Sequence, residues 1–265
     1  MMQLSACIEW LFADEADAFA DRIRRAKTAG FDAVEFWQWR NKDLDTIALT
    51  LEETGVSLSG FVAEPMIALT DKAYHAQFLD GLRQSVDVAQ RLGATVLIAQ
   101  AGNDLPGHSR AEQRDALTAC LAAAADVLEG SGVRLGVEPL NTRIDHKGYF
   151  LPSTTEALDI IDDVGRAEIG IVYDLYHSLV MDEVPQEVLA GRVDRVIHVH
   201  VADHPGRNDP GTGTLDLRTP LAWIFDQGYA GRVGLEYRPA HGTTAGLEMV
   251  RERLGRSPAV PRPAS

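Results

Sequence analysis

Short apolar runs and longer amphipathic segments alternate along the chain as far as about residue 255. The apolar runs have the length of strands, and residues 94–100 are largely apolar on both sides of such a strand. This character predicts strands that are buried on both faces, as in a parallel sheet. We predict strands at 3–8, 33–36, 56–62, 94–100, 133–138, 169–174, 196–202 and 232–237.

The segments between these strands have the periodicity of amphipathic helices. Several end in glycine, as at Gly30, Gly55 and Gly93, which is typical of a helix C-terminus. Two begin with the capping-box pattern Ser-x-x-Glu, at 109–112 and 153–156. We predict helices at 14–29, 43–54, 71–92, 109–129, 153–163, 184–190, 216–227 and 244–254.

Eight strands, each followed by a helix and with no linker between them, predict an α/β fold with a single (β/α)8 TIM barrel over residues 1–255. A doubly wound sheet is the competing architecture, and it would place a glycine-rich turn after the first strand. The chain has no such turn there. Residues 256–265 are rich in Pro, Arg and Ser, and we expect them to form a disordered tail.

The composition fits a soluble globular protein, with 45% hydrophobic and 24% charged residues among 265. The formal net charge of −14 argues against a nucleic-acid or anionic-membrane partner, which would require a basic surface. No apolar run is long enough to span a bilayer, and no signal peptide is indicated. Cys7 and Cys120 lie in apolar runs and indicate no disulfide framework. We therefore expect a cytoplasmic protein.

The stretch 196–207 places an unusual group of polar side chains in and after a predicted strand. His198 and His200 lie on one face of that strand, and apolar residues occupy the other face. Imidazoles on the inner face of a buried strand are costly unless they have partners. We expect His200 to bind a metal ion, and His198, deeper along the strand, to make a hydrogen bond behind it.

Three carboxylates and His200 fall at the C-terminal ends of four successive predicted strands, where TIM barrels carry their chemistry. Glu138, Asp174 and Glu236 each close an apolar run, and successive members of the set are 36, 26 and 36 residues apart. Each interval is one strand–helix–strand unit, so the four side chains should reach one mouth of the barrel. Charges there must be paired or bound to a cation. The set predicts a divalent metal ion, Mg, Mn or Co, because such ions accept oxygen donors with one imidazole.

Six short motifs add to these strand ends. They are Val137-Glu138-Pro-Leu-Asn141, Gly148-Tyr-Phe-Leu151, Tyr173-Asp174-Leu-Tyr176-His177, Ala202-Asp203-His-Pro-Gly-Arg207, Pro210-Gly-Thr-Gly213 and Gly234-Leu-Glu236-Tyr237. Together they resemble the hydroxypyruvate isomerase family, which belongs to the xylose isomerase-like TIM barrels together with the ketose 3-epimerases. The resemblance covers nearly the whole chain and is densest from 133 to 240.

The resemblance implies that Glu138, Asp174, His200 and Glu236 bind the metal, and that Glu138 and Glu236 also act as the catalytic acid/base pair. It implies an isomerase that shifts a proton between adjacent carbons through an enediolate, converting hydroxypyruvate to tartronate semialdehyde. At position 200, hydroxypyruvate isomerases commonly carry Gln, whereas the epimerases carry His. The substrate therefore stays open between hydroxypyruvate, a related oxo acid and a ketose.

Two more residues are candidates for binding the substrate. His177 lies shortly after the aspartate that ends the sixth predicted strand, within reach of a substrate oxygen. Arg207 lies in a Pro-Gly-Arg loop, and its planar guanidinium matches a carboxylate. Trp10, Trp37 and Trp39 either wall the pocket or pack in the core.

Other functions stay open at this point. A ketose 3-epimerase would use the same metal and glutamate pair, and a sugar-binding barrel that has lost catalysis would keep only the fold. A barrel nuclease of the endonuclease IV type would need more histidine ligands and a basic face, which a chain of net charge −14 does not favour. We expect a small-molecule substrate and no nucleic-acid or membrane partner, and we leave a homo-oligomer open.

Overall fold

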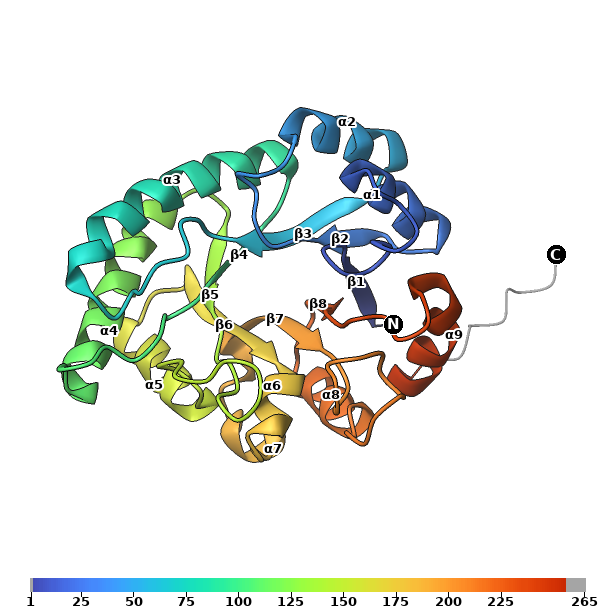
Figure 1. The fold of residues 1–265 in the computed structure, drawn as a ribbon. Coiled ribbons are helices and arrows are strands. Elements are labelled where there is room, and N and C mark those ends of the chain that lie inside the picture. The colour runs from blue at the N-terminus through green and yellow to red at the C-terminus, as the bar shows by residue number, and fades with distance from the viewer. Residues whose placement is uncertain (1, 256–265) are drawn as a thin grey trace.

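Eight parallel strands form a closed barrel with helices around it, which confirms the predicted fold class (Figure 1). The structure is a computed structural model that describes residues 2–255, so the predicted tail at 256–265 lies outside the described residues. The strands follow one another around the barrel in chain order, and the last pairs with the first. Their bounds are β1 Gln3–Cys7, β2 Ala33–Glu35, β3 Ser57–Val62, β4 Val96–Ala99, β5 Arg134–Val137, β6 Ile169–Asp174, β7 Val196–Val201 and β8 Arg232–Leu235.

Helices connect successive strands, because a parallel strand can begin only after the chain has returned to the same end of the sheet. The apolar core fills the space between sheet and helices. None of the described helices is both long and apolar enough to cross a membrane. The helices are α1 Phe19–Thr28, α2 Leu44–Thr54, α3 His75–Leu92, α4 Arg110–Leu128, α5 Thr154–Val164, α6 Leu175–Val180, α7 Pro185–Val188, α8 Arg218–Asp226 and α9 Thr243–Leu254, with 3-10 turns η1 Lys72–Tyr74 and η2 Val193–Arg195.

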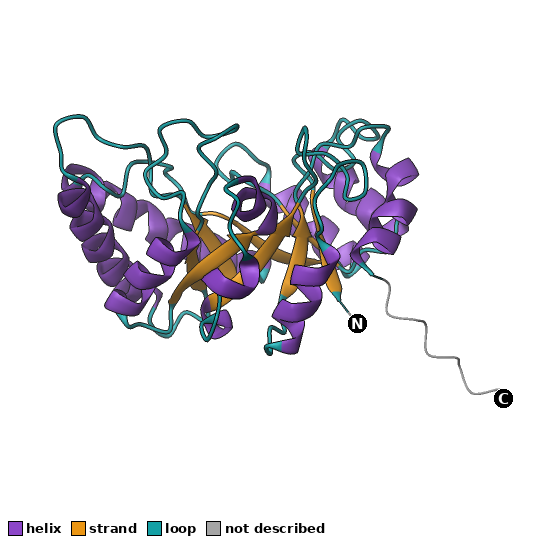
Figure 2. Ribbon diagram, turned by 90° about the horizontal axis from the view of Figure 1, so that it is seen from below, coloured by secondary structure: helices purple, strands orange, loops and turns teal. Residues whose placement is uncertain are grey.

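The loops differ in length between the two ends of the barrel (Figure 2). Those that follow the strands, as after β5 and β7, are long, whereas most of those that enter the strands are short. The strand register aligns the strand ends: Asp174 of β6 lies opposite His200 of β7, which lies opposite Gly234 of β8. Residues that are far apart in the sequence therefore meet at one level of the barrel, under the long loops.

The first helix begins later than the sequence pattern predicts. α1 begins at Phe19, not near residue 14. The segment before it contacts the other end of the described chain, since the Glu15 carboxylate accepts hydrogen bonds of 2.8 Å from both the backbone N–H and the hydroxyl of Thr244. Thr244 lies in the first turn of α9. This contact joins the first and last units of the barrel and replaces the predicted extra helical turn.

Two other helices also differ from the prediction. The predicted helix at 71–92 is divided, because η1 precedes α3, which begins at His75. The sequence pattern did not predict α6, which begins directly after β6. The Asp174 carboxylate accepts hydrogen bonds from the backbone N–H groups of Tyr176 and His177 and so caps α6. One side chain therefore ends a strand and starts a helix.

One of the two predicted capping boxes forms completely. At the start of α4, the side chains of Ser109 and Glu112 each accept a hydrogen bond from the backbone N–H of the other residue. At the start of α5, Ser153 caps the helix, but the Glu156 carboxylate accepts a hydrogen bond from Arg110 of α4. An ion pair between neighbouring helices thus takes the place of half of the second box.

The backbone of α3 packs directly on the loop after β3. A Cβ atom added to Gly81 would lie 2.2 Å from the carbonyl oxygen of Glu64 and 2.3 Å from Cδ of Pro65. Both neighbours belong to or sit close to the backbone, so they have little freedom to move aside. This contact fixes α3 against the barrel.

Gly81→Ala is therefore expected to destabilise the fold by about 1–3 kcal/mol through overpacking. At an open helix position the same change would stabilise by roughly 1 kcal/mol, so the sign of the effect reports the contact. Urea unfolding measures the difference. Asp87→Ala, at an exposed position of α3, is the control and should change stability by less than about 0.5 kcal/mol. A Gly81→Ala protein as stable as the wild type would contradict the close packing.

Candidate active site

The four predicted metal ligands meet at the C-terminal mouth of the barrel. Glu138 and Glu236 directly follow β5 and β8, Asp174 ends β6, and His200 lies in β7. One ligand atom from each residue lies within 4.8 Å of those from the other three. All four side chains are buried. We call these four residues the carboxylate cluster.

Two basic side chains lie among the carboxylates. His200 Nδ1 lies 3.1 Å from Glu138 Oε1 and 3.5 Å from Glu236 Oε2. The guanidinium of Arg207 lies 3.3 Å from Asp174 Oδ2 and also donates to the Glu236 carboxylate. Each carboxylate therefore faces a donor, and the cluster is held together by opposite charge.

Burial and crowding change the protonation of this cluster. Burial raises the pKa of Asp174 to about 7; Arg207 opposes the rise, and Glu138 adds to it. For His200, burial favours the neutral ring, but the carboxylates of Glu236 and Glu35 outweigh burial and raise its pKa well above the usual value. The cluster therefore attracts positive charge, either as protons or as a cation.

The donor set fits a divalent metal ion. Glu138, Asp174 and Glu236 offer carboxylate oxygens, and Nδ1 of His200 faces the same space. Mg, Mn and Co ions prefer such oxygen-rich sets, and thiolates, which would favour softer ions, do not belong to the cluster. These four residues are the ones that would hold the ion.

His177 lies beside the carboxylate cluster and leaves one ring nitrogen available. Its Nδ1 lies 3.2 Å from the backbone N of Asn141 and 2.6 Å from the side-chain amide nitrogen of that residue. Because both are donors, Nδ1 accepts and the proton is assigned to Nε2. Nε2 lies 3.4 Å from Asp174 Oδ2 and makes no hydrogen bond within residues 2–255. Burial lowers the pKa of His177 well below its usual value, so the neutral ring has one N–H to offer a ligand.

Arg207 reaches the carboxylate cluster from the loop after β7. Its backbone is left-handed, with φ of 54°. Its guanidinium lies over the rings of Trp10, at 5.2 Å, and Tyr176, at 5.5 Å. The loop is held by the Asp203 carboxylate, which accepts hydrogen bonds from three backbone N–H groups farther along it. From the sequence we assigned no role to Asp203. Its place in the Ala-Asp-His-Pro-Gly-Arg motif was the feature that could have pointed to it.

Of the three tryptophans Trp10, Trp37 and Trp39, the first two lie at the site. Trp37 Nε1 donates a 2.6 Å hydrogen bond to Glu236 Oε1. The ring of Trp10 packs edge-on against Trp37, with centroids 4.9 Å apart. Trp39 Nε1 instead donates to Ser85 Oγ of α3 at 3.1 Å. Trp10 and Trp37 therefore lie beside the carboxylate cluster, whereas Trp39 packs between the barrel and α3.

Glu35 is a buried carboxylate that the sequence pattern did not single out. It ends β2 and forms a second group of possible ligands with His198 and His200. His198 Nε2 lies 2.9 Å from Glu35 Oε2, so His198 makes a hydrogen bond behind His200. The available signal was that Glu35 closes an apolar run in the same way as the other strand-end carboxylates.

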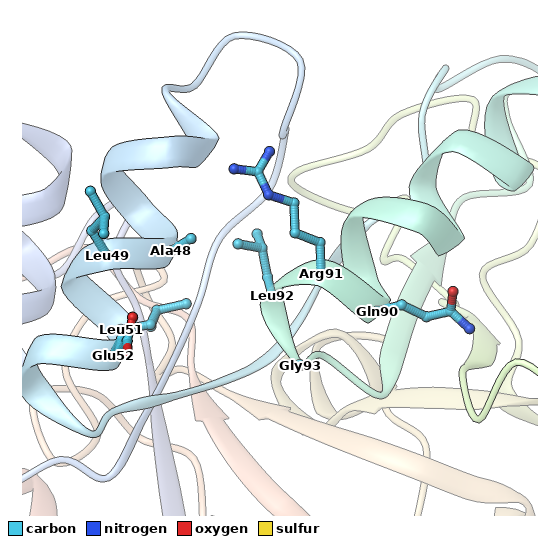
Figure 3. Close-up of a pocket in the computed structure, with 8 residues that line it drawn as sticks. All are labelled: Ala48, Leu49, Leu51, Glu52, Gln90, Arg91, Leu92 and Gly93. Atoms are coloured by element: carbon cyan, nitrogen blue, oxygen red, sulfur yellow. The ribbon is translucent and has the colours of Figure 1, made fainter.

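A hollow of about 430 Å³ lies elsewhere, between α2 and α3 (Figure 3). Its charged lining residues, Glu52 and Arg91, are exposed, and none of the candidate site residues lines it. The hollow therefore has no buried charged side chain in its lining, in contrast to the barrel mouth. The residues that line it are Ala48, Leu49, Leu51, Glu52, Gln90, Arg91, Leu92 and Gly93.

The chain is similar to known proteins over almost all of its length. The family described as xylose isomerase-like TIM barrel matches residues 23–253. Hydroxypyruvate isomerase of Escherichia coli is 30% identical over 254 residues, which cover 93% of this chain and 97% of that protein. The 2-oxo-tetronate isomerase of Cupriavidus necator is 30% identical over 248 residues, which cover 90% and 94%. A Brucella melitensis structure described as a family 2 AP endonuclease has a TM-score of 0.87 and 29% identity, and covers 94% of this chain and 98% of that one.

Asp174 is expected to make stability depend on pH when EDTA removes divalent ions. Its folded-state pKa, about 7, lies above the ordinary value of 3.8, so protonation favours the folded state and this stabilisation is lost as pH rises through 7. Lowering the pH from 8 to 5 should stabilise the wild type relative to Asp174→Asn by about 2–3 kcal/mol. Urea unfolding of both proteins at each pH measures the change. A difference that does not vary with pH would contradict the raised pKa.

Proposed function

The chain belongs to the hydroxypyruvate isomerase family of xylose isomerase-like TIM barrels, and from this premise we propose its reaction. This membership makes the chain an isomerase. In the proposal it shifts a proton between adjacent carbons of a small hydroxy-oxo acid, converting hydroxypyruvate to tartronate semialdehyde. The supporting observation is the buried carboxylate cluster, which combines a cation site with two glutamates in one space.

In this proposal Glu138, Asp174, His200 and Glu236 hold a divalent metal ion. When bound, the ion supplies Lewis-acid stabilisation of the negative charge that develops on the substrate oxygens. The surrounding residues keep bulk water away, since all four side chains are buried. Trp37 orients Glu236 through its hydrogen bond to Oε1.

Glu138 and Glu236 act as the acid/base pair. They approach the same space from β5 and β8, with His200 Nδ1 3.1 Å from one carboxylate and 3.5 Å from the other. One glutamate takes a proton from the hydroxyl-bearing carbon and leaves an enediolate. A glutamate then returns a proton to the neighbouring carbon while the hydroxyl proton passes from one substrate oxygen to the other, so substrate and product have the same formula.

Arg207 and His177 bind the substrate. The guanidinium of Arg207 lies at the edge of the carboxylate cluster, where its planar fork can pair with a substrate carboxylate. The Nε2–H of His177 makes no hydrogen bond within the described residues and is available to a substrate oxygen. These two groups favour a small acid over a neutral sugar.

A ketose 3-epimerase is the second candidate, because residue 200 is His, as is common in that group, and not Gln. A direct assay separates the two. Hydroxypyruvate and 2-oxo-tetronate are supplied beside D-fructose and D-tagatose, and the specificity constants are compared. A larger kcat/KM for a ketose would overturn the proposed substrate and leave the acid/base pair in place.

Two further functions are tested by the same preparations. A non-catalytic sugar-binding barrel would bind a sugar and turn over none of these substrates. The description of the Brucella structure raises a nuclease, and the net charge of −14 argues against binding a polyanion. Cleavage of DNA containing an abasic site would overturn this argument.

Glu138→Gln and Glu236→Gln are each expected to lower kcat for hydroxypyruvate by about 10²–10⁴-fold, because an amide does not transfer the proton. The assay follows tartronate semialdehyde at saturating Mn²⁺. Glu187→Gln, an exposed glutamate of α7, is the matched control and should keep the wild-type kcat. Wild-type kcat in either of the first two variants would remove that residue from the chemistry.

Arg207→Met is expected to raise KM for hydroxypyruvate by about 10–100-fold, because it removes a charge-assisted contact to the substrate carboxylate. The inhibition constant of a neutral ketose should change far less. Arg207→Lys, which keeps the charge but loses the planar fork, should give a smaller rise in KM. Equal losses for the acid and the ketose would show that Arg207 only stabilises the pocket.

A further inference from the structure

Glu35 lies behind the carboxylate cluster, between two histidines inside the barrel. It ends β2, and its side chain is 4% exposed. His198 Nε2 lies 2.9 Å from Glu35 Oε2, and His200 Nε2 lies 3.1 Å from Glu35 Oε1. Glu35 therefore contacts His200 through the ring nitrogen that does not face the cluster.

The two oxygens of Glu35 have different surroundings. Oε2 lies 3.0 Å from Ser59 Oγ and 2.9 Å from His198 Nε2. Ser59 Oγ in turn lies 2.6 Å from Ser5 Oγ, which ties Glu35 to β1 and β3. Oε1 and His200 Nε2 each lack a hydrogen-bond partner within residues 2–255. They lie 3.1 Å apart, within the distance of a hydrogen bond.

The neighbouring strand β8 leaves room for this pair. His200 lies opposite Gly234 in the sheet. A Cβ atom added to Gly234 would lie 2.3 Å from Glu35 Oε1 and 2.6 Å from His200 Cδ2. A side chain at this position would push Glu35 and His200 apart. The pair therefore accounts for the glycine in the motif Gly-Leu-Glu236.

The two nitrogens of the His200 ring thus face different groups. Nδ1 faces Glu138 and Glu236, whereas Nε2 faces Glu35. A neutral imidazole carries one N–H, and the partner of one nitrogen decides which of the two holds the proton. Metal-binding histidines commonly donate their other N–H to a carboxylate, which fixes both the tautomer and the direction of the ring.

We propose that Glu35 is the positioning residue of the metal site. It accepts a hydrogen bond from Nε2 of His200, so that the lone pair of Nδ1 stays directed at the space between Glu138 and Glu236. Glu35 touches neither the ion nor the substrate and acts only through His200. The proposal rests on the proposed function, because it takes the four-residue metal site as given.

Titration calorimetry with Mn²⁺ is the first test, because it needs no turnover. Glu35→Gln keeps the shape of the side chain and removes its charge, and it should weaken Mn²⁺ binding by about 10–100-fold. Wild type and variant should each bind one ion. Glu168→Gln, at a glutamate just before β6, is the matched control and should leave the affinity unchanged.

Three results would overturn the proposal. The first is an unchanged Mn²⁺ affinity in Glu35→Gln. The second is a wild type that binds two ions and a variant that binds one, since Glu35 would then be a ligand of a second site with His198 and His200. The third is a wild type that binds no Mn²⁺ at all.

His200→Asn separates positioning from a general loss of structure. The asparagine oxygen stands near the position of Nδ1, and the shorter side chain does not reach Glu35. Adding Glu35→Gln to His200→Asn should change the Mn²⁺ affinity by less than about threefold, because the path through His200 is gone. The same loss as in the wild-type background would show that Glu35 acts by another route, and would overturn the proposal.

Nitrogen-15 NMR of histidine-labelled wild type loaded with Mg²⁺ gives a readout that requires no Glu35 variant to fold. The His200 signals, assigned by their loss in His200→Asn, should show a proton on Nε2 and none on Nδ1. A proton on Nδ1 would overturn the proposal. A wild type that has the expected tautomer and binds Mn²⁺, but isomerises none of the acids or ketoses, would reject the proposed function and still support the role of Glu35.

Discussion

Three carboxylates share one buried space at the mouth of the barrel, and this crowding of like charge is the constraint on which the site depends. At Asp174, burial is the main reason that the pKa rises to about 7; Glu138 adds to the rise and the guanidinium of Arg207 opposes it. Charges interact more strongly in such a space than in water. Three polar neighbours offset this charge: Arg207 donates to two of the carboxylates, Trp37 donates to one oxygen of Glu236, and His200 lies between two glutamates. A bound cation would complete the same balance.

The barrel supplies the rigidity that keeps these charges together. Each carboxylate stands at or just after the end of a strand that is hydrogen-bonded to a neighbour on both sides, so mutual repulsion does not easily spread the cluster. The register places Asp174, His200 and Gly234 side by side on three adjacent strands. Since Gly234 has no side chain, the interior at this level is free for the polar groups of β2 and β7. The fold thus provides both the position of the charges and the space for their partners.

Much of this arrangement is predictable from the sequence, because a carboxylate that closes an apolar run stands out against its neighbours. That pattern predicts the eight strands, and it predicts that four side chains meet at one end of the barrel: Glu138, Asp174, His200 and Glu236. The pattern does not predict contacts between distant segments. The start of α1 depends on Glu15 and its hydrogen bonds to α9, far away in the sequence. The link between Glu35 and His200 crosses the barrel interior and becomes visible only when β2 and β7 are placed in space. Local periodicity carries no information about such pairs.

The charge balance also connects the substrate class to the protonation of the site. When all three carboxyls of the cluster are ionised, Arg207 and a divalent ion would together offset their charge of −3. The negative charge of a substrate carboxylate would then have no positive partner left in the site. An acid substrate is accommodated when one carboxyl of the cluster holds a proton, which is also the state that a general acid requires. Without a bound cation, burial raises the pKa of Asp174 to about 7, so the metal-free cluster can hold a proton near neutral pH. A neutral ketose makes no such demand. In the proposed reaction, the charge of an acid substrate would therefore be balanced within the same buried group of carboxylates that holds the cation.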